Sequence, residues 1–574
     1  MLIRADKNHG VIDSPISVAA GQLLNGCPGR RKWKLGNFYF ELSAANLEYL
    51  DLHFPSAEWG ESILPYLTKV KALRIEERTL QETKHAPIAP DMEFEYKTTP
   101  RAHQERCFII SRDKVAFGIF AEMGCGKTKI VLDTAAYLYS KGEIDCMIVF
   151  APNGVHRNWV SNEIPAHLPD WTKAKAVYWS SSKAKQKRLF NESLTYREGL
   201  LILAYNIEYL SLGAKALEGL TTILRERKVL LVIDESTRIK SPSSNRSLSA
   251  IKLAPLARYR RIMSGAPVTN GLENLFMQFK FLDPDILGFS SFYTFRNRYC
   301  IVRQVSRDNP HAVEIVGYQN IEEFQKRIDG HSFRVEKKDC LDLPPKIYLE
   351  REVPMTDDQR KMYDTLREDL MVDLGNGTVV DGNSAITRIL KLQQILCGFI
   401  IDENKNRLPV PSRRMDAVEE ILDEIGDRKV IIWSRFIYNI EQLIEMCRKK
   451  GIGAVAYYGA VKDDAREEAV NSFQNDPACQ VFIGQQRSGG IGLTLTAATT
   501  VVYFSNTFDA EERWQSEDRA HRIGQTASVT YIDLVCSGTV DKKIARALKE
   551  KKDIAAMAFA LGKGGGLFEL LGEE

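Results

Sequence analysis

Several features that would place the chain in a familiar class are missing from its sequence. None of the ten cysteines forms a C-x-x-C pair, which argues against a zinc ribbon or a disulfide framework and favours a reducing cytosol. No apolar run is long enough to span a bilayer, and the first residues lack the apolar core of a secretion signal. Membrane insertion and secretion are therefore not expected.

A large charge of one sign is missing as well. The formal net charge is only +3, with 44% hydrophobic and 27% charged residues, which is ordinary for a soluble globular protein. A surface for nucleic acid would have to come from local basic clusters, such as residues 30–34, 183–188 and 258–261. A chain of 574 residues is too long to fold around one compact core, so we expect two to four domains.

Short apolar runs alternate with amphipathic, helix-like segments in two separate stretches of the chain. The runs are residues 115–120, 146–150, 200–203 and 229–233 in the first stretch, and 429–433, 481–483, 500–504 and 529–534 in the second. This rhythm predicts an α/β fold with two parallel-sheet lobes. The intervening residues 286–410 are mostly helical in pattern and rich in aromatic and charged residues.

A glycine-rich segment follows the first apolar run and begins a helix. It reads A-E-M-G-C-G-K-T from Ala121 to Thr128. Glycines allow backbone N–H groups to turn around phosphate oxygens, and the helix N-terminus adds a favourable dipole. In such a loop Lys127 would bind the β and γ phosphates, and the Thr128 hydroxyl would hold Mg²⁺. The alternative is a glycine-rich turn with an exposed lysine.

Two carboxylates end the apolar run at residues 229–233. Asp234 and Glu235 stand at this strand tip, where paired acids are costly unless a cation accompanies them. Asp234 fits the Mg²⁺ partner and Glu235 fits the base that orients the attacking water. A helix-capping acid pair is the alternative interpretation.

A third candidate element lies nearly 300 residues later. Arg519 and Arg522 are three residues apart, so a helix would carry both on one side. Arginines supplied from a facing lobe stabilise the charge that phosphoryl transfer spreads over the γ oxygens. Without the first lobe this stretch would be taken for a solvated helix.

The ordered motifs resemble the SWI/SNF-type DNA translocases of helicase superfamily two, from about residue 96 to about 550. The resemblance rests on P-R-A-H-Q at 100–104, N-W at 158–159 with Glu163, A-Y-N at 204–206, D-E-S-T-R-I-K-S-P at 234–242, S-G-A-P-V-T-N at 264–270, L-P-P-K at 343–346 with Gln359 and Tyr363, V-I-I-W-S-R-F at 430–436, S-G-G-I-G-L-T-L-T at 488–496 and R-A-H-R-I-G-Q at 519–525. The last of these is the most specific.

The resemblance implies the fold, the ligands and a set of site residues. It implies two tandem RecA-like lobes, ATP with Mg²⁺, and DNA bound largely without sequence preference. The catalytic residues would be Lys127, Asp234, Glu235, Arg519 and Arg522, and Mg²⁺ would bind Thr128 and Asp234. ATP would also contact Gln104, which reads adenine, and Gly124, Cys125, Gly126, Gly492 and Gln515. DNA would contact Asn158, Trp159, Tyr205, Ser434, Arg435, Ser488 and Gly489.

Domain boundaries follow from these motifs. They are an N-terminal accessory domain at 1–90, the ATP-binding lobe at 91–285, a helical insertion and inter-lobe linker at 286–410, the second lobe at 411–550 and a C-terminal tail at 551–574. Two prolines predict a linker at 85–90, and Gly564–Gly566 predict a flexible tail. No obvious histone-reading module is present, so chromatin remodelling is not favoured. The compactness of the chain favours a bacterial or phage-infected cytosol over a nucleus, and we expect a monomer.

The chain departs from the family pattern at several positions. Ala121 replaces a glycine, Thr237 a histidine, Ala266 a threonine and Thr494 an asparagine. None of these removes a phosphate, Mg²⁺ or arginine-finger group, so ATP hydrolysis should survive, while its coupling to movement is in doubt. Cys125 could be a redox handle, although a small space-filling residue is the preferred interpretation.

The first 90 residues contain an element similar to P-G-R-x-W of annealing helicases. Residues 28–33 read P-G-R-R-K-W, and arginine with tryptophan suits phosphate contact and base stacking. This predicts a module that recognises branched DNA; the alternative is a small β domain that packs on lobe one.

The function predicted from the sequence is ATP-driven movement on duplex or branched DNA, in repair, recombination or replication-fork remodelling. A remodeller that displaces or recycles a DNA-bound protein such as RNA polymerase is one alternative, with residues 286–345 as a docking surface. A strand-separating DNA or RNA helicase is another, although no β-hairpin wedge is evident between the late motifs. An inert nucleotide-binding scaffold would require missing catalytic residues, and none is missing.

Overall fold

The structure is a computed structural model in which the chain forms two units, Met1–Cys340 and Leu341–Asp553. It describes residues 1–548 except 7–8, 14, 84–93, 181–183, 269–270, 305–312, 341–342, 376–389, 403, 462, 490–492, 508, 523 and 546–547. The predicted linker at 85–90 and the tail therefore lie outside the described residues. Within the described part, no helix has both the length and the apolarity needed to cross a bilayer.

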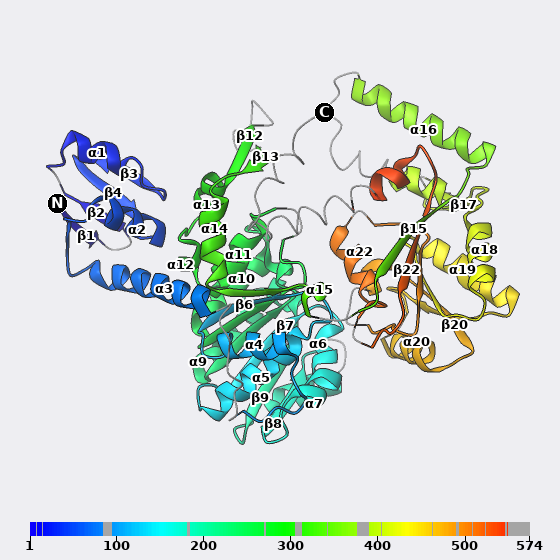
Figure 1. Ribbon diagram of the computed structural model, residues 1–574, viewed down its shortest axis with the longest axis horizontal. Coiled ribbons are helices and arrows are strands. Elements are labelled where there is room, and N and C mark those ends of the chain that lie inside the picture. Colours follow the sequence, from blue (N-terminus) through cyan, green and yellow to red (C-terminus); the bar gives the residue numbers. More distant parts are fainter. Residues whose placement is uncertain are drawn as a thin grey trace. The chain divides into compact units, whose positions relative to one another are not determined.

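The first unit begins with a small α/β module. Its elements are β1 (Leu2–Asp6), β2 (His9–Ile12), α1 (Val18–Leu24), β3 (Arg31–Lys34), β4 (Asn37–Glu41), α2 (Ala44–His53), β5 (Glu58–Trp59) and α3 (Leu64–Thr83). The strands form one mixed sheet in the order β3-β4-β2-β1-β5 (Figure 1). Phe38 and Phe40 alternate with half-buried neighbours along β4 and are buried in the core beneath α2 and α3.

A seven-stranded parallel sheet forms the centre of the rest of this unit, in the order β14-β6-β11-β10-β7-β9-β8. Its strands are β6 (Ala116–Ala121), β7 (Cys146–Ala151), β8 (Ala174–Tyr178), β9 (Leu200–Asn206), β10 (Val229–Asp234), β11 (Tyr259–Met263) and β14 (Ser332–Val335). β6, β7, β9 and β10 match the predicted apolar runs, because strands covered by helices on both faces need no polar alternation. β11 separates the phosphate-loop strand β6 from β10.

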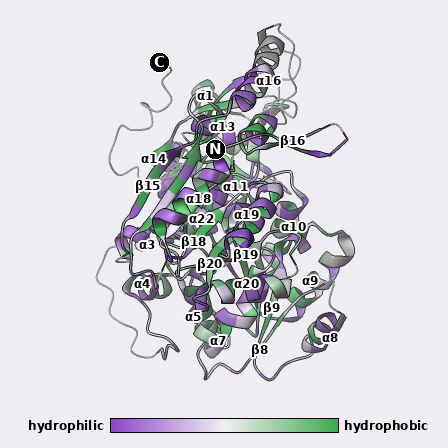
Figure 2. Ribbon diagram, turned by 90° about the vertical axis from the view of Figure 1, so that its right-hand side faces the viewer, coloured by the Kyte–Doolittle hydropathy of each residue, from purple (hydrophilic) through white to green (hydrophobic). Residues whose placement is uncertain are grey.

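Helices connect the strands of this sheet. They are α4 (Ala102–Ser111), α5 (Lys127–Ser140), α6 (Val155–Asn158), α7 (Ile164–His167), α8 (Ala184–Ser193), α9 (Ala214–Glu226), α10 (Asn245–Leu253), α11 (Asn274–Leu282), α12 (Pro284–Leu287), α13 (Phe292–Tyr299), α14 (Ile321–Asp329) and α15 (Lys337–Cys340), with a hairpin of β12 (Cys300–Gln304) and β13 (Val313–Tyr318). A single π-turn at Trp159–Glu163 joins α6 to α7. The apolar strands and helices of this unit share one buried core. Figure 2 colours the ribbon by the hydropathy of each residue, with hydrophobic residues in green.

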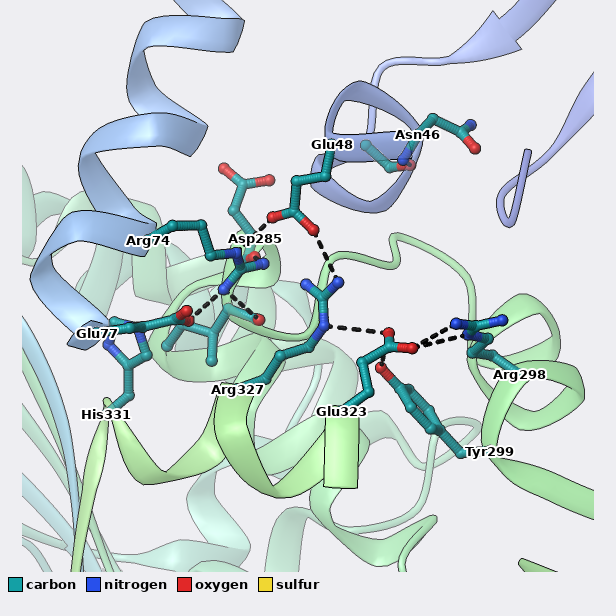
Figure 3. A network of polar contacts seen from close by, with 12 residues as sticks. Asn46, Glu48, Arg74, Glu77, Asp285, Arg298, Tyr299, Glu323, Arg327 and His331 are labelled. Carbon is teal, nitrogen blue, oxygen red and sulfur yellow. Dashed lines mark hydrogen bonds and ion pairs between the residues drawn. The ribbon is translucent and has the colours of Figure 1, made fainter. Parts of the chain in front are cut away.

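The N-terminal module is attached to the rest of the unit by a network of buried and half-buried polar and charged side chains (Figure 3). Arg74 of α3 donates to Glu48 of α2 and to Glu77 of its own helix. Arg327 of α14 donates to the other oxygen of Glu48 at 2.7 Å, and His331 lies 3.2 Å from Glu77. His331 immediately precedes β14. The module, which combines a sheet with three helices, thus contacts the rest of the first unit through α2 and α3.

The second unit contains a six-stranded parallel sheet in the order β15-β22-β21-β18-β20-β19. Its elements are β15 (Lys346–Glu352), α16 (Asp357–Gly375), β16 (Phe399–Ile401), β17 (Arg407–Pro409), α18 (Arg414–Ile425), β18 (Val430–Trp433), α19 (Ile437–Lys450), β19 (Gly453–Tyr457), α20 (Asp463–Asn475), β20 (Cys479–Gly484), α21 (Gln486–Gly489), β21 (Thr500–Tyr503), α22 (Ala510–Glu517) and β22 (Val529–Val535). The predicted architecture of two parallel-sheet α/β lobes is confirmed.

The segment 286–410 differs from the mostly helical insertion that its pattern predicts. Its strand β14 completes the edge of the first sheet, and its strand β15 completes the edge of the second. It also contains the hairpins β12–β13 and β16–β17. Short strands such as the four-residue β14 carry too few residues for a period of two to be recognised beside helical neighbours. The segment therefore contributes to both lobes.

Candidate functional site

The glycine-rich segment forms a tight loop between β6 and α5. Gly124 and Gly126 have φ angles of 86° and 82°, in the left-handed region that a side chain disfavours. A Cβ atom at Gly126 would also lie 2.1 Å from Nε2 of Gln104. Backbone conformation therefore requires both glycines, and space requires Gly126 as well, as a loop built to surround phosphate demands.

Lys127 is bound to its own loop. Its ammonium donates to the carbonyl of Ala121 at 2.9 Å, and the residue is only 9% exposed. At the neighbouring Gly265 a Cβ would lie 3.6 Å from Lys127 Nζ, an ordinary contact, and 3.0 Å from Met123 Cγ of the same loop, which is tight. A buried ammonium next to a neutral carbonyl is a weak arrangement compared with one facing phosphate. The residue is thus placed to exchange this carbonyl for a phosphate oxygen.

Two side chains of α4 hold the centre of the loop. Gln104 donates to the carbonyl of Cys125 at 3.0 Å and accepts from the N–H of Arg101 at 2.9 Å. His103 Nε2 donates to the same carbonyl of Cys125 at 2.8 Å. The structure thus brings Gln104 to the loop, and it adds His103, which sequence reasoning missed although the residue adjoins Gln104.

The carboxylates lie at the carboxyl end of β10. Asp234 Oδ2 accepts from the indole N–H of Trp159 at 3.0 Å, and Oδ1 accepts from the N–H of Glu235. Burial and, to a smaller extent, the charge of Glu235 raise the pKa of Asp234 to about 7, although Trp159 and Lys127 oppose the shift. Glu235 has a φ of 52°, an unfavourable conformation for a side chain of this kind. Perturbed carboxylates and strained backbone are concentrated at functional sites.

A buried hydrogen-bond chain connects these carboxylates to the segment after β11. Ser236 Oγ donates to Gln278 Oε1 at 2.6 Å, and Gln278 Nε2 donates to the carbonyl of Pro267 at 2.8 Å. Sequence reasoning missed Gln278; its signal was an uncharged polar residue in the middle of the mainly apolar helix α11. This hydrogen-bond chain joins the motif at 234–242 to the motif at 264–270. Thr269 and Asn270 of the second motif lie outside the described residues.

These residues fit ATP with Mg²⁺. The loop fits phosphate because its two left-handed glycines let backbone N–H groups turn inward, and Gly126 leaves no room for a side chain. A hydroxyl at Thr128 and a buried carboxylate at Asp234 are oxygen donors, the ligands that Mg²⁺ prefers. The raised pKa of Asp234 is what an acid that awaits a cation shows.

The arginines of the second unit lie in a turn rather than on a helix. α22 ends at Glu517, and residues 518–522 continue as turns and bends, which corrects the predicted helix. Arg519 Nη1 and Arg522 Nη1 nevertheless reach the same carbonyl, that of Leu493, at 3.5 and 3.1 Å. Arg519 is 1% exposed. The two guanidinium groups therefore lie on the same side, as expected, but a turn rather than a helix places them there.

Gln525 fixes this arginine turn. Its side-chain amide donates to the carbonyls of Thr496, Ala498 and Ala520 at 3.0–3.1 Å. His521 Nε2 donates to the carbonyl of Pro344 at 2.8 Å. Of the other residues predicted to contact ATP here, Gln515 donates to Glu511 at 3.0 Å, and Gly492 lies outside the described residues.

Comparisons with known proteins agree with this geometry. Residues 103–399 match the model of the SNF2-related domain, and residues 413–524 match that of the helicase conserved C-terminal domain. The chain belongs to the SNF2-related family. The predicted family and its enzyme class are thereby confirmed, since both matched domains are those of ATP-dependent helicases.

Two relatives of this SNF2-related chain are long proteins. It is 25% identical over 443 residues to an uncharacterized ATP-dependent helicase of Mycoplasma pneumoniae, covering 76% of this chain and 40% of the relative. It is 27% identical over 483 residues to the bovine DNA annealing helicase and endonuclease ZRANB3, covering 83% and 42%. It spans less than half of either relative. The Sulfolobus solfataricus SWI2/SNF2 ATPase core in complex with dsDNA matches with a TM-score of 0.38 at 23% identity, over 83% of this chain and 96% of that one.

Several residues of the SNF2-related chain that were expected to contact DNA are buried. Trp159 is 0% exposed against Asp234, Tyr205 stacks on Phe150 in the core, and Ser434 is 0% exposed. Their side chains are enclosed by protein in this structure, and DNA contact by these three residues stays a prediction. Each of the three residues lies next to a loop. The spacing of a motif does not show whether a residue in such a place is buried or exposed.

The remaining expected DNA contacts are placed closer to solvent. Asn158 and Arg435 are half-buried. Asn158 donates to Glu163 at 3.1 Å, beside the π-turn that joins α6 to α7, and such turns are frequent at functional sites. The backbone of Ser488 and Gly489 ends α21, while their side chains lie outside the described residues. These four positions stay predictions.

Proposed function

We propose that this SNF2-related chain is an ATPase that converts hydrolysis into movement on duplex or branched DNA, in repair, recombination or replication-fork remodelling. One observation carries the proposal: the phosphate loop and the strand tip of Asp234 and Glu235 lie in one sheet, with Trp159 bonded to Asp234. Relatives named as ATP-dependent helicase and as DNA annealing helicase support ATP and DNA as ligands.

In the proposed reaction each residue of the first unit has a chemical task. Lys127 would leave the carbonyl of Ala121 and bind the β and γ phosphates. Thr128 and Asp234 would hold Mg²⁺, which supplies positive charge to the phosphate oxygens when bound. Glu235 would orient the attacking water and accept its proton. Water then adds to the γ phosphorus as the bond to the ADP oxygen breaks.

Coupling to DNA is proposed to use the buried chain from Ser236 through Gln278 to Pro267. Its first member adjoins Glu235, and its last belongs to the S-G-A-P segment. A shift of either end would be transmitted because all three polar groups are buried and have few alternative partners. In the second unit Arg519 and Arg522 would stabilise the charge on the γ phosphate.

The N-terminal module supplies a candidate surface for branched DNA. All four residues of β3 are exposed, and Trp33 is 44% exposed with its N–H held by Asn25 at 3.0 Å. Arg31, Lys32 and Lys34 would contact phosphates and the indole would stack on an unpaired base. A Lys32→Glu/Trp33→Ala variant should lose stimulation by forks and keep stimulation by linear duplex.

The proposed function is tested by measuring the ATPase rate with duplex, single-stranded, forked and four-way DNA. We expect duplex or branched DNA to stimulate the rate at least tenfold, and Glu235→Gln to abolish it while MgATP still binds. A displacement assay on the same forks separates translocation from strand separation. A rate that no DNA raises would contradict the proposal.

A further inference from the structure

A second cysteine, Cys340 of α15, lies beside Cys125 of the phosphate loop. Nine of the ten cysteines are buried, and Cys340 alone is half-buried. Its Sγ lies 3.6 Å from the Sγ of Cys125, the residue between the two loop glycines, and it also donates to the carbonyl of Glu336 at 3.2 Å. Two thiols are thus in contact at the phosphate loop, and the ATPase chemistry uses neither of them.

A fixed framework brings the two sulfurs together. The N–H of Glu122 donates to the carbonyl of Val335 at 3.0 Å, and the N–H of Lys337 donates to Glu122 Oε2 at 2.8 Å. These bonds attach the start of α15 to the start of the loop, so Cys340 at the end of α15 is held against Cys125. A disulfide requires the sulfurs to approach by about 1.5 Å more, which side-chain rotation and small loop shifts can supply.

We propose that Cys125 and Cys340 form an oxidative modification site, in which a disulfide formed by a peroxide switches off the ATP site. The proposal rests on the proposed ATPase function. The half-exposed Cys340 thiolate attacks a peroxide oxygen; its S–O bond forms, the O–O bond breaks, and the departing hydroxide takes up a proton to leave as water. The sulfur of Cys125 then displaces the second oxygen, which leaves as water with the proton of that thiol. The peroxide is reduced by two electrons and the two thiols are oxidised.

The disulfide would hold the loop in its nucleotide-free form. Cys125 contributes the carbonyl that accepts from His103 and Gln104, and its neighbours Gly124 and Gly126 must present their N–H groups to phosphate. A covalent bond from this residue to Cys340, the last residue of the first unit, prevents the loop from rearranging. We therefore expect the disulfide to lower the affinity for MgATP, and not only to slow the catalytic step.

The surroundings of Cys340 determine when the reaction is fast. Burial raises the pKa of Cys340, the charges of Asp339 and Glu122 raise it further, and Cys125 and Arg101 lower it. Because the thiolate is the nucleophile, the oxidation rate should increase as the pH rises. The experiment is therefore best performed at mildly alkaline pH.

The test compares the reduced and the peroxide-treated full chain. MgATP affinity and ATPase rate are measured, and non-reduced peptide mapping identifies the linked cysteines. We expect a Cys125–Cys340 linked peptide, at least a tenfold loss of MgATP affinity, and recovery with dithiothreitol. Cys340→Ser should retain the reduced activity and resist peroxide, and the matched control Cys300→Ser should respond like the unaltered chain.

Each contrary outcome has a distinct meaning. No linked peptide in treated protein, a linked peptide without weaker MgATP binding, or equal inactivation of Cys340→Ser would each overturn the modification site. A reduced chain that lacks ATPase activity would instead contradict the proposed function, because the linked peptide is detected independently of hydrolysis.

Discussion

The phosphate loop of the first unit and the arginine turn of the second hold their cationic groups in the same way. Lys127 donates to the carbonyl of Ala121, and both Arg519 and Arg522 donate to the carbonyl of Leu493. Each carbonyl is a neutral partner that a negatively charged phosphate can replace at little cost. Both units thus hold against backbone carbonyls the cationic groups that the proposed function assigns to the nucleotide.

The two regions differ in how firmly that arrangement is fixed. The loop is built on left-handed glycines and is held at one carbonyl, that of Cys125. The arginine turn is held by Gln525, which donates to three carbonyls. The comparison teaches that the loop is set by its own backbone conformation, while the arginine turn is held by the hydrogen bonds of one side chain.

The largest expected effect comes from removing the loop cation. Lys127→Ala should lower the ATPase rate by about 10⁴-fold, because this residue serves both binding and the transition state. The measurement is the steady-state rate with saturating DNA. Thermal unfolding is the control: the melting temperature should stay close to that of the unaltered chain, since Lys127 makes one hydrogen bond to its own loop. A normal rate would disprove the site.

Breaking the support of the arginine turn should have the next largest effect. Gln525→Leu leaves three buried carbonyls without this donor, so we expect the second unit to lose about 2 kcal/mol of stability. Displacing the arginines should lower kcat by about 100-fold. Urea unfolding and kcat are measured together. The matched control is Gln480→Leu, since the side-chain amide of Gln480 makes a hydrogen bond that is exposed to solvent. A stable variant with reduced kcat would still support positioning; unchanged kcat would contradict it.

A smaller effect is expected from cutting the buried chain in the first unit. Gln278→Leu removes the bonds to Ser236 and Pro267 while conserving much of the side-chain volume. DNA stimulation of the ATPase should fall about tenfold, in line with typical coupling energies of 1–3 kcal/mol, and the rate without DNA should change less. If both rates fall by the same factor, the chain supports catalysis rather than coupling.

The smallest effect concerns pH. The pKa of Asp234 is raised to about 7 in the folded protein, so its proton competes with Mg²⁺ below that pH. Activity at limiting Mg²⁺ should therefore rise as the pH increases through about 7. Trp159→Phe removes an N–H donor that lowers this pKa, so the rise should move to higher pH and the rate at neutral pH should fall about threefold. A profile identical to that of the unaltered chain would count against the Trp159 contact.

The sequence predicted the two parallel sheets and the residues at the strand tips because both follow from local patterns. Apolar runs such as 229–233 define a buried strand, and the acids that follow must lie at its end. The bond between Trp159 and Asp234 and the chain through Gln278 depend on packing between distant segments, which motif spacing does not contain. The burial of Tyr205 and Ser434 escaped prediction for the same reason. The arginine turn was predicted as helix because three-residue spacing occurs in tight turns as well.

Binding of a transition-state analogue tests most directly whether the two units act on one triphosphate. MgADP with aluminium fluoride and MgADP alone are titrated against the unaltered chain and Arg522→Ala in the presence of duplex DNA. The account predicts that the variant binds the analogue about 10³-fold more weakly and binds MgADP unchanged, because the guanidinium acts on the transferring phosphate. Equal affinity of both proteins for the analogue would contradict it.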